Sequence, residues 1–115
     1  MKDLPNVVRI IGVDYLVSEG NERDDPRLRE NAAIIDHCAC EIRFDESWGE
    51  GTRAVEYMLH EILHGVEVAC DLRLKERVVA SLARGLAAVL LDNPCLRSWI
   101  ERQAEAANER TRMES

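Results

Sequence analysis

The chain has 115 residues, of which 46% are hydrophobic and 32% charged, and its net charge is −7 at pH 7. This length fits one domain with a modest core and is too short for two. The negative charge disfavours nucleic acid as a partner, because phosphate binding needs clustered Lys and Arg. The chain has no apolar run of about 18 residues and no secretory signal at its start, so we expect a cytoplasmic protein with no membrane partner.

The first pattern in the chain is typical of strands. Val7–Val17 is rich in β-branched residues, with Gly12 and Asp14 interrupting, and predicts two short strands or one bent strand. Residues 18–32 are polar and contain glycine, asparagine and proline, which predicts a loop.

Two further strands are expected after this loop, at Ala33–Asp36 and Glu41–Phe44, joined around His37–Cys40. Apolar and charged residues alternate in the second of them. This alternation places Ile42 and Phe44 on one face, so the strand should be half-buried.

The strongest helix signal follows these strands. Ser47 and Glu50 match the S-x-x-E capping pattern and Thr52 offers a second cap, so a helix should begin between Ser47 and Thr52. Apolar residues then recur at helical spacings of three and four: Val55, Met58, Leu59, Ile62, Leu63, Val66, Ala69 and Cys70.

Two more helices are predicted at the C-terminal end. One should run from about Leu74 to Leu91, and its expected apolar stripe is Val78, Val79, Leu82, Leu86, Val89 and Leu90. A short third helix should begin at Pro94 and bury Leu96, Trp99 and Ile100. Residues 103–115 have little to bury and should fray, which leaves residues 1–102 as a single domain.

Strand patterns in the first half and helical patterns in the second indicate an α+β domain, with a small N-terminal antiparallel sheet followed by helices. The four cysteines are expected to be free thiols in a protein without an export signal. The spacing of Cys38 and Cys40, after His37, is too tight for the usual zinc knuckle, and no second pair follows.

The sequence His60-Glu61-Ile62-Leu63-His64 is an H-E-x-x-H motif. At about 100° per residue, His60 and His64 project from one helix face and can share a metal ion. In this motif the histidines supply neutral nitrogens to Zn2+, while the glutamate accepts a proton from the bound water. Both histidines lie away from the apolar stripe of the helix, so they face a cleft or the solvent. A solvated helix face is the alternative interpretation.

A catalytic zinc needs a third protein ligand and one open position. On a straight helix Glu67 lies about 10 Å and Asp71 about 16 Å from His60, too far for one ion, although Glu67 or Asp71 can accept a proton from a ligand histidine. Glu76 opens the next helix after a turn, and by elimination it is the third ligand we expect. Cys70 occupies the last histidine position of the metzincin pattern, which excludes that class in its standard form.

The run HEILHGVE, followed by LKERVVASLARGLAAVLLDNP, resembles small phage and prophage metallopeptidase-like proteins related to the ImmA/IrrE zincins. The resemblance spans about Ile34 to Trp99. It implies a minimal zincin fold, zinc on His60 and His64, Glu61 as general base and a third ligand from the following helix. Such relatives often carry two or more acids near the start of that helix, where this chain has Glu76 and then Ala80.

The sequence therefore predicts a zinc-dependent peptidase of narrow specificity that acts on a peptide or protein substrate. Tyr57 and His37 are candidate donors to the oxyanion, and the strand Glu41–Phe44 is a candidate edge for pairing with the substrate. The alternative is a zinc-binding structural or protein-interaction domain without catalysis. The substrate and the oligomeric state stay open.

Overall fold

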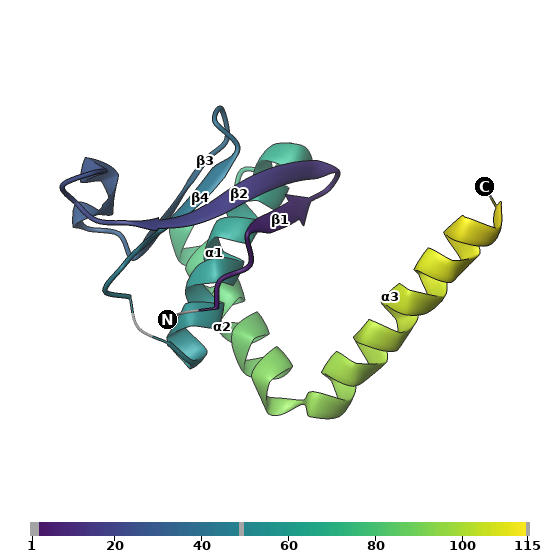
Figure 1. Ribbon diagram of the computed structural model, residues 1–115. Helices are drawn as coiled ribbons and strands as arrows, with labels where there is room; N and C mark the ends of the chain where they lie inside the picture. The colour runs from purple at the N-terminus through teal and green to yellow at the C-terminus, as the bar shows by residue number, and fades with distance from the viewer. Residues whose placement is uncertain (1–2, 49, 115) are drawn as a thin grey trace.

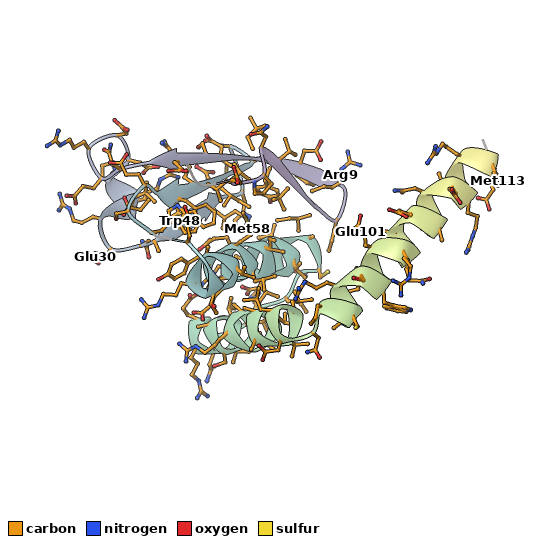
Figure 2. All side chains as sticks on the ribbon, turned by 60° about the horizontal axis from the view of Figure 1, so that its bottom comes forward. Arg9, Glu30, Trp48, Met58, Glu101 and Met113 are labelled. Atoms are coloured by element: carbon orange, nitrogen blue, oxygen red, sulfur yellow. The ribbon has the colours of Figure 1, made fainter. Side chains whose placement is uncertain are left out.

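The computed structural model describes residues 3–48 and 50–114. Within them the chain forms an α+β structure with a small four-stranded sheet, a short 3-10 helix and three α-helices (Figure 1). The elements are β1 Val7–Ile10, β2 Val13–Gly20, η1 Pro26–Arg29, β3 Ala33–Asp36, β4 Glu41–Asp45, α1 Thr52–Ala69, α2 Glu76–Asp92 and α3 Pro94–Glu114. The sheet, α1 and α2 form three successive layers, and α3 extends away from them (Figure 2).

The sheet has the strand order β1-β2-β4-β3 and is mixed. β1 and β2 form a hairpin whose two turn residues, Ile11 and Gly12, have φ angles of 46° and 82°, as a type I′ turn requires. β3 and β4 are antiparallel, as predicted, but β2 and β4 pair in parallel. The expected antiparallel sheet is therefore wrong at its centre. The chain leaves β2, reaches the far edge as β3 and returns as β4, so β4 is an interior strand and not the expected edge.

One face of the sheet packs against α1 and forms the core. Ile42 and Phe44 are fully buried, which confirms the predicted alternation in β4. The helix contributes a partly buried set that packs against this cluster: Tyr57, Met58, Ile62 and Val66. Gly65 allows close approach of helix and sheet, since a Cβ atom there would lie only 2.6 Å from Cδ1 of Ile10.

Part of the polar segment predicted as a loop is ordered by charge. β2 extends to Gly20, which lies so close to Arg43 that a Cβ atom would overlap its guanidinium. Further along, the Asp25 carboxylate is buried and contacts the guanidinium of Arg27 at 2.6 Å and that of Arg43 at 3.6 Å. The hydrogen bond from Arg27 lowers the pKa of Asp25 to about 2. This ion cluster fixes the crossover into β3.

Helix α1 begins at Thr52 without a side-chain cap, because Gly51 is its N-cap residue. Neither predicted cap is used: the Ser47 hydroxyl donates to Asp45, and Gly49 of the predicted capping box lies outside the described residues. At the C-terminus Asp71 has a φ of 53°, and the Leu72 N–H donates to the Glu67 carbonyl at 2.8 Å. This Schellman-type turn reverses the chain and starts α2 beside α1.

Helix α2 packs on α1 through residues with small side chains. Val79, Ala83 and Ala87, spaced by four, are buried against α1. The prediction of a bulky apolar stripe is wrong for four of its six members, because Val78, Leu82, Leu86 and Val89 are exposed. Short side chains let the two helix axes approach closely, and the larger residues are left on the neighbouring face.

Helix α3 differs most from the expectation. It continues to Glu114 over the segment predicted to fray, contains no buried residue, and leaves Trp99 and Ile100 exposed, against the prediction that they are core. Arg97 donates to the carbonyls of Leu90 and Leu91 and so caps the end of α2. α2 and α3 are bent by 93° at this junction.

Within the described part of the chain, no single helix is long and apolar enough to cross a membrane.

Candidate metal centre

The H-E-x-x-H residues lie on α1 at the edge of its contact with α2. His60 and His64 are one turn apart, with ring centroids 4.9 Å from each other, and both rings are about three-quarters buried. Glu76, the first residue of α2, reaches back to them. Its carboxylate oxygens lie 2.5 Å from Nε2 of His60 and 3.1 Å from Nε2 of His64. The structure thus brings together the three side chains that the sequence predicts as ligands.

This group has the composition and size of a small metal site. One ligand atom from each of His60, His64 and Glu76 lies within 4.8 Å of the other two. Tetrahedral zinc with bonds of 2.0 to 2.1 Å keeps its ligand atoms about 3.3 Å apart, so the contacts of Glu76 with the two histidines need only small side-chain rotations to admit the ion. Two imidazole nitrogens and one carboxylate also match a catalytic zinc donor set.

Glu67 holds His64 from the other side. The Nδ1 atom of His64 lies 2.8 Å from Glu67 Oε1. Because a carboxylate only accepts hydrogen bonds, Nδ1 carries the proton, and in the neutral ring the lone pair is then on Nε2, which faces Glu76. The other Glu67 oxygen accepts the Leu74 N–H at 2.9 Å. That hydrogen bond, and after it the contact with His64, lowers the pKa of Glu67.

Glu61 is the buried acid of the site. Its exposed fraction is only 8%, and together with Gly65 it forms the buried positions of α1. Burial, and after it the nearby Glu76 carboxylate, raises the pKa of Glu61 to about 8. A cation held by His60, His64 and Glu76 would favour the carboxylate form, because opposite charge lowers the pKa of an acid.

The two candidate oxyanion donors are placed differently. Tyr57 packs against the hydrophobic core, whereas His37 lies in the β3–β4 turn with its Nδ1 atom 3.3 Å from the Tyr15 hydroxyl. His37 also lies near enough to Glu67 to lower its pKa. Sequence reasoning missed Tyr15, a buried residue of β2, because a tyrosine in a strand pattern carries no signal for its contact across the sheet.

The remaining candidates are outside the group. Asp71 occupies the turn after α1, and Cys38, Cys40, Cys70 and Cys95 are free thiols. Among the described residues, the cluster that could bind a metal consists of His60, His64 and Glu76, and no cysteine or further histidine or acid belongs to it. The arrangement has three protein donors, and Glu76 is largely exposed, so the group is open to solvent.

The fold and the site together define an α+β domain with a candidate His-His-Glu metal centre. No family model matches this chain, and neither does any curated protein or solved structure.

Proposed function

We propose that the protein is a zinc-dependent peptidase of narrow specificity. One observation supports this most: the Nε2 atoms of His60 and His64 converge on the Glu76 carboxylate, with Glu67 on the far side of the His64 ring. Because Nδ1 of His64 carries the proton, its Nε2 lone pair faces the Glu76 carboxylate, and a cation between these two acceptors would relieve their repulsion. Three donors leave a position for water, which is the pattern of a catalytic site rather than of a closed structural one.

The residues of the site divide the chemistry among them. When bound, zinc would lower the pKa of a coordinated water toward about 7 and polarise the carbonyl of the substrate. Glu61 accepts a proton from the attacking water and delivers it to the leaving amine, and its burial keeps bulk water away from this transfer. Glu67 keeps the His64 ring in the tautomer that would present Nε2 to a metal ion.

An outer strand of the sheet lies beside this site, where an extended peptide would pair. β3 is an edge strand, and its Ile35 lies within contact distance of a Cβ atom placed at Gly65, the residue after His64. Backbone hydrogen bonds along β3 would align a peptide over the histidines. This assigns to β3 the role that the sequence suggested for Glu41–Phe44.

Two measurements test the proposal. Elemental analysis of untagged protein should find about one zinc per chain in the wild type, and much less in Glu76→Ala, which removes one of three ligands. Cleavage of a proteome-derived peptide library, read by mass spectrometry, should disappear in Glu61→Gln while its zinc content stays unchanged. Glu56→Gln, an acid on the same helix paired with Arg84 at 3.7 Å, is the matched control and should retain cleavage.

The outcomes separate the alternatives. A wild-type protein that takes up no zinc even when zinc is added contradicts the whole proposal and leaves His60 and His64 on a solvated face. Zinc binding without any Glu61-dependent cleavage favours the structural or protein-interaction domain.

A further inference from the structure

A stripe of large apolar side chains runs along the outer part of α2. We name Val78, Leu82, Leu86 and Val89 the α2 stripe; their exposed fractions lie between 36% and 48%. Their spacings of four, four and three place them within about 80° of one another around the helix, beside the buried alanines. A stripe of this kind is typical of a helix that packs on another helix.

Helix α3 is also exposed along its length. It is 21 residues long and none of its described residues is buried. Trp99 and Ile100, at its start, are 52% and 44% exposed. The 93° bend directs α3 away from α2 of its own chain (Figure 2). In proteins most helical stability comes from packing against other elements, and the described part of the chain supplies little such packing to α3.

The surface area of the chain also exceeds that of a compact monomer. A monomer of 13.1 kDa is expected to expose about 6,400 Å² and to have a radius of gyration of about 13 Å. The observed values are 8257 Å² and 15.4 Å. The excess is roughly 1,900 Å² per chain, and obligate dimers bury about 1,000 to 2,500 Å² per subunit. This excess of exposed surface over that of a compact monomer therefore has the size of a dimer interface.

Net charge does not oppose self-association at this surface. Residues 76–114 contain six arginines and six acids, so the whole net charge of −7 lies on the rest of the chain. Two copies can bring α2 and α3 together without net repulsion, while their negatively charged portions stay apart. α3 carries four arginines and four glutamates, so it lacks the excess of basic residues that attracts a helix to an anionic lipid surface, which disfavours lipid as the covering partner.

We propose that α2 and α3 form the interface of a two-fold symmetric homodimer, in which the start of α3 from each protomer covers the α2 stripe of the other. The interface is self-complementary, because each protomer offers the same stripe and the same Trp99 and Ile100. The exchange covers both exposed apolar sets at once. This inference does not depend on zinc binding or on peptidase activity.

Sedimentation equilibrium of the full chain tests the proposal, with the wild type expected at about 26 kDa, twice the chain mass of 13.1 kDa. Leu82→Glu combined with Leu86→Glu should sediment at 13.1 kDa, because it places charges in the stripe. Ser81→Glu combined with Ala88→Glu adds the same charge to exposed positions roughly 100° around the helix, and should stay dimeric.

Circular dichroism establishes that each variant is folded. If the double glutamate variant loses helicity, Trp99→Ser takes its place, because this exposed residue contributes little to the fold of one chain and should still weaken the dimer. A monomeric wild type overturns the proposal, and flotation of that monomer with phosphatidylglycerol vesicles would assign the surface to a membrane instead. A folded Leu82→Glu and Leu86→Glu variant that stays dimeric also overturns it.

Discussion

Replacing Glu67 by alanine is expected to weaken zinc binding by about 100-fold, without removing a ligand. Residues that orient ligand histidines are worth about 10- to 100-fold in metal affinity. The loss for Glu67 should lie at the upper end of this range because its carboxylate makes two contacts. One is with the His64 ring at 2.8 Å, and the other is with the Leu74 N–H at 2.9 Å, two residues before Glu76. It therefore positions two of the three proposed ligands. Glu67→Gln keeps an acceptor for one contact and should lose about 10-fold.

Competition with a chromophoric chelator measures these affinities in the purified protein. Glu56→Ala is the matched control, because Glu56 lies on the same helix and pairs with Arg84 instead of a histidine. Its zinc affinity should stay within about two-fold of the wild type. Equal affinities for wild type and Glu67→Ala would refute the reasoning, since they would mean that His64 is oriented without Glu67.

Three further predictions concern stability. Phe44→Ala should lower the free energy of unfolding by about 3–5 kcal/mol in urea titrations, whereas Leu16→Ala, at an exposed position of β2, should change it by less than about 0.5 kcal/mol. The Asp25 carboxylate contributes stability that is complete above its unfolded pKa of 3.8 and is lost as the pH falls through its folded value of about 2. Asp25→Asn should remove that component from acid-unfolding curves; an unchanged curve would contradict the role of the ion cluster. Gly65→Val should cost about 1–3 kcal/mol because the new side chain meets Ile10, and a raised Tm would show that the sheet can move away.

The sequence predicts β4 and α1 well because their local patterns coincide with their burial. Ile42 and Phe44 alternate with charged residues and both face the core. In α1 the apolar residues and the two histidines recur within a few helical turns, so their spacing along the sequence is sufficient to predict the helix and the face that carries the histidines. Glu76 approaches His60 because a short turn joins the two helices. The sequence also indicates Glu76, because the other nearby acids, Glu67 and Asp71, are too far along α1 to share an ion with His60.

Other features depend on contacts that no local pattern encodes. The parallel pairing of β2 with β4 joins segments more than twenty residues apart, and no periodicity specifies its direction. Hydrophobicity favoured Leu82 and Leu86 as the packing face of α2, but close helix approach selects the smaller Ala83 and Ala87. Residues 103–114 contain only alanines and Met113 as apolar residues, yet alanine, glutamate and arginine have high intrinsic helix propensity, which the prediction of a frayed tail underweighted.

The small side chains of Ala83 and Ala87 determine how close α2 lies to α1, and therefore whether Glu76 can contact the histidines. This carboxylate spans the gap between two helices, and the width of the gap is determined by Ala83 and Ala87. A leucine at either position would push α2 outward as a rigid rod and withdraw the Glu76 carboxylate from the histidines, although Ala87 lies about 16 Å along the helix from Glu76. Metal affinity at the proposed site should therefore respond to substitutions at positions that are not ligands and contact no ligand, and an intact H-E-x-x-H motif alone does not guarantee a working site.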